Sequence, residues 1–233
     1  MRPVRAVLFD LDHTLFDTDK TERLALRAVA RTAGMPLGAS ALGTYRIVNT
    51  HVWDEYRAGR LTSKELRVLR FHLWLLKLSR DPARAKSLAL LYLREFSSRV
   101  DLIPGASTAV RSLSLRGFRL GVVTNGIERV QRRRLSESGL LAPFNVVVTS
   151  ERAGFTKPDP RIIELALRRL RVKAGEAVYV GDAPAIDALA ANRASVPFVW
   201  FNPRREALTP AGSVVIDHEI SHLREIRGLV RLL

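Results

Sequence analysis

Short apolar runs recur along the chain, and most of them end in a small or polar residue. They are rich in β-branched and aromatic residues and lack apolar–polar alternation, which is typical of strands buried on both faces of a parallel sheet. The runs cover residues 4–10, 118–125, 144–150, 177–182 and 197–202. We therefore predict five parallel strands.

Helical patterns lie between these runs. Helices are predicted over residues of about 107–116, 127–138 and 160–171. Gly117 and Gly139 follow the first two, and glycine is common just after the last turn of a helix. In the third, Ile163, Leu167 and Leu170 fall on one face. Alternating strands and helices predict an α/β fold with a Rossmann-like, doubly wound parallel sheet covered on both sides.

The interval from about 18 to 100 breaks this alternation, because it contains no convincing strand. Thr62 and Glu65 have the spacing of a capping box, and Asp81 precedes Pro82 as an N-cap precedes the first helical residue. Leucines at 66, 69, 73 and 76 form a helical stripe. We predict a four-helix cap domain over 17–100, inserted into an α/β catalytic core made of 1–16 and 101–233.

The composition is that of a soluble globular protein. Of 233 residues, 47% are hydrophobic and 26% are charged, which is enough apolar material for a core and a smaller insert. The absence of cysteine excludes disulfides, thiolate zinc sites and a cysteine nucleophile. The first apolar run is too short for a signal peptide, and no stretch is long enough to span a bilayer. We expect a cytoplasmic monomer or homodimer with no membrane partner.

The formal net charge is +15, carried mostly by arginine. A positive field attracts anions such as phosphate esters, nucleotides or nucleic acid. The arginines are spread along the chain, and the densest run, QRRRL at 131–135, has no interleaved aromatic residue. We interpret this run as a solvated helix face, and we expect no nucleic-acid partner.

Candidate chemistry gathers where the predicted strands end. In open parallel sheets, ligands bind beyond the carboxyl ends of the strands. The residues at or near these ends are Asp10, Asp12, Thr124, Asn125, Gly126, Lys157, Asp182 and Asp187. Alternation along a strand places Asp10 and Asp12 on the same side of the local chain. Each element alone has an ordinary interpretation as a helix cap or turn, but their order and shared position favour one site.

These motifs resemble those of the haloacid dehalogenase superfamily of phosphohydrolases. Its first motif, Asp-x-Asp-x-Thr, matches Asp10, Asp12 and Thr14. Its second, a Thr or Ser that ends a strand, matches Thr124, and its third, a Lys before Pro, matches Lys157. The fourth, Gly-Asp with another Asp five residues on, matches Asp182 and Asp187. The resemblance spans the whole chain, including a helical cap after the first motif.

The resemblance implies a phosphatase that uses an aspartyl-phosphate intermediate. Asp10 would be the nucleophile, and Asp12 would protonate the leaving alcohol and later activate water. Asp10, the backbone carbonyl of Asp12, and Asp182 would hold Mg²⁺, which suits an oxygen-only site. Lys157 would stabilise the nucleophile and the developing charge.

The remaining motif residues have supporting roles in this scheme. Thr124 and the amides around Asn125 and Gly126 would bind phosphoryl oxygens. Asp187 would orient a metal-bound water or Lys157.

Three positions refine the resemblance. Asp12 favours a phosphatase, because the dehalogenases of the superfamily lack this second Asp and deliver no proton to a halide. Position 13 is His where the family most often has Gly. We interpret it as a turn residue pointing away from the site, and the alternative is a histidine near the leaving group. Position 183 is Ala where a small hydroxyl residue is frequent.

Specificity is expected to lie in the cap. Residues 51–71 look like the cap of a branch that includes house-cleaning 5'-nucleotidases and acylneuraminate phosphatases. Trp53, Tyr56, Arg57 and Arg60 could stack on a base or hold a second anion, although we favour packing between cap helices for the two aromatics. The predicted substrate is a small phosphorylated metabolite, with a nucleoside 5'-monophosphate as the hypothesis. A sugar phosphate or phosphoglycolate is the alternative, and a non-enzymatic nucleic-acid-binding protein is a third interpretation.

Overall fold

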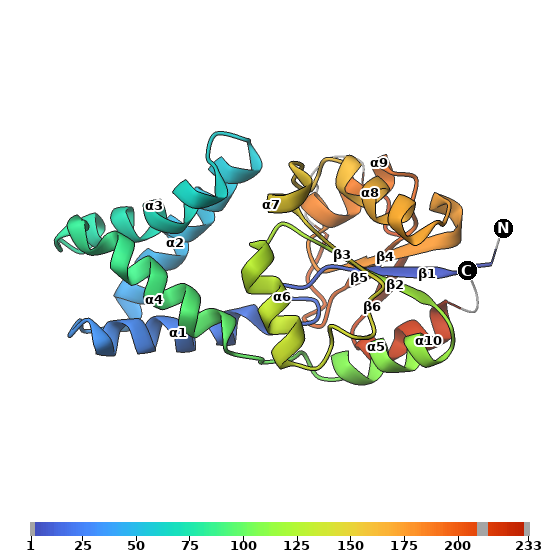
Figure 1. Ribbon diagram of the computed structural model, residues 1–233, viewed down its shortest axis with the longest axis horizontal. Helices are drawn as coiled ribbons and strands as arrows, with labels where there is room; N and C mark the ends of the chain where they lie inside the picture. The colour runs from blue at the N-terminus through green and yellow to red at the C-terminus, as the bar shows by residue number, and fades with distance from the viewer. Residues whose placement is uncertain (1–2, 209–213, 231–233) are drawn as a thin grey trace. The chain divides into compact units, whose positions relative to one another are not determined.

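A computed structural model describes residues 3–208 and 214–230 (Figure 1). The chain divides into two compact units. The first comprises Met1–Thr18 and Val100–Leu233, and the second comprises Asp19–Arg99.

The first unit is built on a six-stranded parallel sheet with the strand order β3-β2-β1-β4-β5-β6. The strands are β1 (Ala6–Phe9), β2 (Arg119–Thr124), β3 (Val146–Thr149), β4 (Ala177–Gly181), β5 (Phe198–Phe201) and β6 (His218–Ile220). All five predicted strands are present. The sequence missed β6, because it spans only three residues and begins with two polar ones.

Helices cover both faces of this sheet. They are α5 (Ala106–Leu115), α6 (Glu128–Glu137), α7 (Ser150–Ala153), α8 (Arg161–Leu170), α9 (Leu189–Arg193) and α10 (Ile226–Leu229). In Figure 1, α8 and α9 lie on one face, and α5 and α10 lie on the other. The α/β doubly wound fold predicted from the sequence is therefore correct.

Alternate side chains of β1 pack into two different apolar clusters of the core. Val7 and Phe9 pack with the apolar face of α5, whereas Ala6 and Leu8 pack with that of α8. Because both faces of the strand are buried, its side chains are apolar without alternation. Asp10 is the first residue after this strand, so the sheet fixes the position of its backbone.

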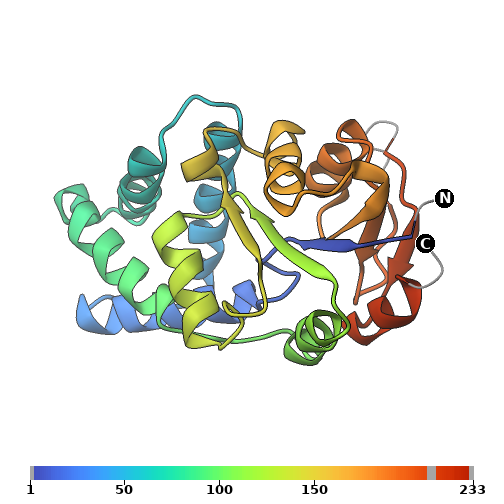
Figure 2. The same ribbon diagram turned by 45° about the vertical axis from the view of Figure 1, so that its right-hand side comes forward.

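The second unit consists of helices, apart from its turns. They are α1 (Thr18–Thr32), α2 (Ala39–Arg57), α3 (Ser63–Lys77) and α4 (Ala85–Ser97), with a short 3₁₀ turn, η1 (Pro82–Arg84). Figure 2 shows these helices from a second direction. Their aromatic core includes Tyr45, Phe71, Trp74 and Tyr92, whose ring centroids lie 5.3–6.0 Å apart.

The predicted caps of this unit are present. The Thr62 hydroxyl accepts from the Glu65 amide, Glu65 accepts from the Thr62 amide, and Asp81 caps the 3₁₀ turn. The predicted leucine stripe is partly wrong, because Leu76 is 50% exposed. Trp74 and Leu75 are buried instead, so the buried face of α3 is rotated away from the stripe.

Among the residues that the structure describes, no helix combines the length and apolar character that crossing a membrane requires.

Candidate active site

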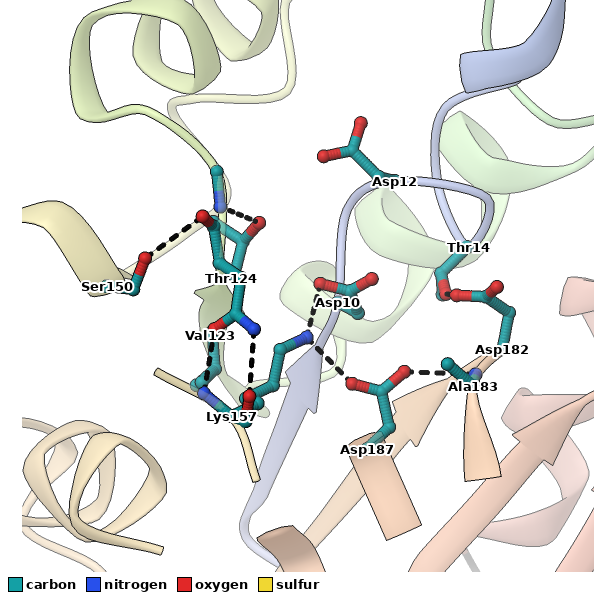
Figure 3. Close-up of polar contacts among 12 residues, drawn as sticks. Asp10, Asp12, Thr14, Val123, Thr124, Ser150, Lys157, Asp182, Ala183 and Asp187 are labelled. Atoms are coloured by element: carbon teal, nitrogen blue, oxygen red, sulfur yellow. Dashed lines mark hydrogen bonds and ion pairs between the residues drawn. The ribbon is translucent and has the colours of Figure 1, made fainter. Parts of the chain in front are cut away.

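Three carboxylates meet at the carboxyl ends of β1 and β4 (Figure 3). Asp10 follows β1, Asp182 follows β4, and Asp187 lies one turn further on. Each offers an oxygen, and these oxygens lie within 4.8 Å of one another. The parallel pairing of β1 with β4 brings the strand ends together, so residues 172 positions apart in the sequence (182 − 10) share one cluster.

Lys157 supplies the cation of this cluster. Its Nζ atom donates hydrogen bonds of 2.7 Å to Asp10, 2.7 Å to Asp187 and 2.9 Å to the Tyr179 hydroxyl. All three donor positions of the ammonium are therefore used, and the side chain is buried. A buried lysine is tolerated here because carboxylates surround it.

Asn125 holds Lys157 in place from the β2 side. Its side-chain oxygen accepts from the Lys157 amide at 2.7 Å, and its side-chain nitrogen donates to the Lys157 carbonyl at 3.0 Å. These two contacts fix the segment before the cis Lys157–Pro158 bond. The predicted phosphate-binding role concerned the backbone amide, so the side chain has a separate positioning role.

The electrostatics of the cluster are set by burial. Burial raises the pKa of Asp10 well above its usual range, with Lys157 opposing this effect and Asp187 and Asp182 adding to it. Burial beside Asp187 raises the pKa of Asp182 to about 7. Burial acts to lower the pKa of Lys157, but Asp10 and Asp187 outweigh it and raise that pKa.

The donor set fits a hard divalent cation. Three crowded carboxylates disfavour one another's charged form, and a divalent ion bound between them would relieve that repulsion. The available ligand atoms are all oxygens, which suits Mg²⁺. Thr14 donates to Asp182 at 3.1 Å and orients it.

Asp187 is packed tightly against the end of β4. The Ala183 amide donates to its Oδ2 at 3.1 Å, and the Tyr179 hydroxyl donates to its Oδ1 at 3.1 Å. A Cβ at Gly181 would lie 2.4 Å from Oδ2, so the glycine makes room for this carboxylate.

The sequence analysis did not identify Tyr179 as a site residue, because a tyrosine inside an apolar strand looks like an ordinary core residue in the sequence.

Asp12 has a different set of partners from Asp10. Its Oδ1 accepts from the Thr18 hydroxyl and from Arg134 Nη1, both at 2.6 Å, and its Oδ2 accepts from Gln131 Nε2 at 2.6 Å. Figure 3 shows its carboxylate turned away from that of Asp10. Burial acts to raise the pKa of Asp12, but Arg134 and the hydrogen bond from Thr18 outweigh it and lower that pKa to about 2.

The prediction that residues 131–135 form a solvated helix face is wrong for three of them. Gln131, Arg134 and Leu135 are 2%, 0% and 0% exposed. Arg132 and Arg133 pair with Glu128 and Glu137 at the surface. The helical spacing of the buried positions could have indicated their burial. Positions 131 and 134 share a face with the apolar Val130 and Leu135, which are buried on the same helix.

The turn after β2 places Thr124 and Gly126 at the same rim. The Gly126 amide donates to the Thr124 hydroxyl at 3.1 Å, and Ser150 donates to the Asn125 carbonyl at 2.9 Å. A Cβ at Gly126 would lie 2.1 Å from Gln131 Nε2. Glycine at 126 therefore leaves the space that the Gln131 side chain occupies.

His13 and Ala183 stand where the resemblance to the superfamily is incomplete. His13 has a φ of 60°, a left-handed conformation that favours glycine, and its side chain is exposed. It is a turn residue, as the sequence suggested. Ala183 contributes its backbone amide to Asp187.

The four cap residues singled out from the sequence contact other parts of their own unit. Tyr56 is 8% exposed and belongs to a small apolar cluster against which Trp53 packs, and the two rings lie 5.6 Å apart. Arg57 pairs with Asp54, and Arg60 pairs with Glu55 through two hydrogen bonds.

Comparison with known proteins agrees with this geometry. A family model described as haloacid dehalogenase-like hydrolase matches residues 4–195. The chain belongs to the haloacid dehalogenase-like hydrolases. It is therefore an enzyme.

Individual relatives cover almost the whole chain. The HAD-hydrolase YfnB of Bacillus subtilis (strain 168) is 29% identical over 100% of this chain and 97% of its own length. The crystal structure of YfnB bound to magnesium matches with a TM-score of 0.89 at 28% identity, covering 98% of this chain and 99% of that one.

Two further relatives carry named activities. The pyrimidine 5'-nucleotidase YjjG of Escherichia coli (strain K12) is 28% identical over 93% of this chain and 96% of its own length. A glyceraldehyde 3-phosphate phosphatase of Methanopyrus kandleri is 33% identical over 98% of this chain and 97% of its own length.

Proposed function

We propose that the protein is a magnesium-dependent phosphatase that hydrolyses a small phosphomonoester through an aspartyl phosphate on Asp10. The observation that carries this proposal is the contact between Asp10 and Lys157, beside the carboxylates of Asp182 and Asp187. The ammonium restrains the nucleophile and offers positive charge to an incoming phosphate. Phosphatase activity in relatives of similar length supports the same reaction.

The residues divide the first half of the reaction between them. A carboxylate oxygen of Asp10 attacks phosphorus, the bond from phosphorus to the ester oxygen breaks, and the leaving alcohol takes a proton from Asp12. Lys157 and the amides around Asn125 and Gly126 stabilise the charge that builds on the phosphoryl oxygens.

The second half uses the same groups in reverse. Water attacks the phosphorus of the aspartyl phosphate, Asp12 takes its proton, and the bond from phosphorus to Asp10 breaks to release inorganic phosphate. Asp12 accepts three hydrogen bonds, which favour the ionised carboxylate that this base step requires. The proton that it takes from water is the one that it gives to the leaving alcohol in the next turnover. Mg²⁺ bound by Asp10, the Asp12 carbonyl and Asp182 would neutralise negative charge on the substrate.

We further propose that residues 17–100 act as a cap that selects the leaving group, and that the preferred substrate is a nucleoside 5'-monophosphate. The name of YjjG supports a nucleotide, whereas that of the Methanopyrus relative supports a phosphorylated sugar. An exposed part of Trp53 would stack on the base. The reported interdomain movement of YfnB supports a mobile cap.

A substrate panel tests these proposals. Specificity constants are measured with Mg²⁺ for nucleoside monophosphates, sugar phosphates, phosphoglycolate and p-nitrophenyl phosphate, and again in EDTA. We expect nucleotides to rank first, and Trp53→Ala to lower kcat/KM for nucleotides by about tenfold, the loss of one stacking contact. p-Nitrophenyl phosphate should be unaffected by that change.

The outcomes distinguish the nucleotide hypothesis from the phosphatase assignment. If sugar phosphates rank first, or if Trp53→Ala lowers all substrates alike, the nucleotide hypothesis fails and a general phosphatase remains. Failure to hydrolyse any ester in the panel would refute the phosphatase assignment itself. Leu115→Ala is a matched surface control, because Leu115 is 89% exposed in the other unit.

A further inference from the structure

Two polar side chains of α6 are buried and contact Asp12, yet neither belongs to the four motifs. Gln131 and Arg134 are 2% and 0% exposed. Burial of a guanidinium is unfavourable unless hydrogen-bond and ion-pair partners compensate for the lost hydration. The burial of Arg134 beside the active site therefore needs a physical explanation.

The three side chains form a closed set of hydrogen bonds. Arg134 Nη1 donates to Asp12 Oδ1 at 2.6 Å and to Gln131 Oε1 at 3.1 Å. The second of these contacts fixes the amide of Gln131, so that its Nε2 points at Asp12 Oδ2, 2.6 Å away. Each oxygen of the carboxylate therefore faces a donor of set direction.

The guanidinium is itself restrained by its surroundings. It lies over the ring of Phe16, with 4.2 Å between the guanidinium carbon and the ring centroid. Phe16 is fully buried in the core of the first unit. The orientation of Asp12 is thus tied to the packed core through Arg134.

This arrangement also keeps the two catalytic carboxylates apart. Lys157 bonds Asp10 and Asp187, whereas Arg134 bonds Asp12. The ammonium of Lys157 has used its three donors, and Asp12 has a cation of its own. The two catalytic carboxylates therefore do not compete for one cation.

We propose that Arg134 and Gln131 are positioning residues of the reaction, and that they hold the Asp12 carboxylate in the orientation that proton transfer requires. The inference rests on the acid–base role given to Asp12 in the proposed function. Both residues contact Asp12 directly and would act through its carboxylate.

A double-mutant cycle tests this inference. Arg134→Met and Gln131→Met are made in the wild type and in Asp12→Ala, and kcat and KM are measured on the most active alkyl ester of the panel. We expect Arg134→Met to lower kcat by about 10- to 100-fold, the usual loss for a misplaced catalytic group, with KM nearly unchanged. In Asp12→Ala, the further loss should not exceed about twofold, because Asp12 is no longer there to be positioned.

Arg133→Met is the matched control. It removes a guanidinium from the neighbouring position of the same helix, where Arg133 is 43% exposed and pairs with Glu137. Its kcat should equal that of the wild type. Arg134→Lys keeps the charge and should recover part of the loss.

The inference is overturned if Arg134→Met costs the same factor with and without Asp12, since the role is then structural, or if it leaves kcat unchanged. If Arg134→Met does not fold, Gln131→Met decides by the same comparison, because it removes a donor without changing charge. Should Asp12→Ala itself keep wild-type kcat on the alkyl ester, the proposed function fails first and the inference falls with it.

Discussion

The ammonium of Lys157 donates a 2.7 Å hydrogen bond to the carboxylate of Asp10, and both side chains are buried. The pair brings opposite charges together at a buried place, where burying either charge alone would be unfavourable. Asp187 accepts from the same ammonium at 2.7 Å, so the lysine would keep a carboxylate partner while Asp10 acts as the proposed nucleophile. This geometry supports several predictions.

Asp10→Asn should abolish turnover without unfolding the protein, because an amide is a poor nucleophile. We expect kcat to fall by at least about 10³-fold, as when a nucleophile is removed from other enzymes. The unfolding midpoint should be no lower than that of the wild type, since Lys157 keeps Asp187 and Tyr179 as partners. Phosphate release and thermal unfolding measure the two effects.

Asp159→Asn is the control, because Asp159 pairs with Arg161 outside the cluster. A variant at position 10 that retains most of its rate would remove Asp10 from the nucleophile role.

Asp12→Ala should separate substrates by their leaving groups. Alkyl esters need a proton on the departing oxygen, and loss of a positioned acid costs about 10²- to 10⁴-fold. p-Nitrophenyl phosphate releases a stable anion, so its loss should be smaller. Steady-state kinetics on both esters measure the ratio. Equal losses on the two would contradict the acid role.

Removal of divalent cations should stop hydrolysis. We expect no measurable turnover in EDTA and full recovery on adding excess Mg²⁺. Asp182→Asn should raise the Mg²⁺ concentration for half-maximal activity by at least about tenfold, in line with losses seen when metal sites are perturbed. Activity that persists undiminished in chelator would exclude the magnesium assignment.

The chelated protein should lose stability as pH rises toward 7. Burial beside Asp187 raises the pKa of Asp182 from 3.8 to about 7. Between those values the folded state holds a proton that the unfolded chain has released, so the free energy of unfolding falls with increasing pH across this window and levels off above it. Urea unfolding in EDTA at several pH values measures the slope. Asp182→Asn should show a shallower decline over the same range, and identical slopes in the two proteins would exclude this source of pH dependence.

Much of the fold followed from local patterns. Five strands and the helices α5, α6 and α8 were predicted close to their observed bounds, because buried parallel strands and amphipathic helices have distinct periodicities. The Asp10, Lys157 and Asp182 cluster followed from the rule that strand ends share a rim. The positions of the motifs at the ends of the predicted strands were sufficient for that part.

The contacts around Asp12 could not be predicted in the same way. Arginine is rarely buried, so the run at 131–135 was assigned to solvent, although Arg134 lies on the apolar face of α6. Tyr179 escaped notice because its hydroxyl partners come from other segments of the chain. Both depend on tertiary contacts that no local window contains.

The missing side chain at Gly126 has a consequence for protein engineering. A methyl group there would occupy the place of the Gln131 amide, which reaches Asp12. Under the role proposed for Asp12, diversifying the turn after β2 would therefore disturb proton transfer, even though the turn itself handles no proton. A library that aims to alter leaving-group preference should vary positions 126 and 131 jointly, because the two residues share the same space.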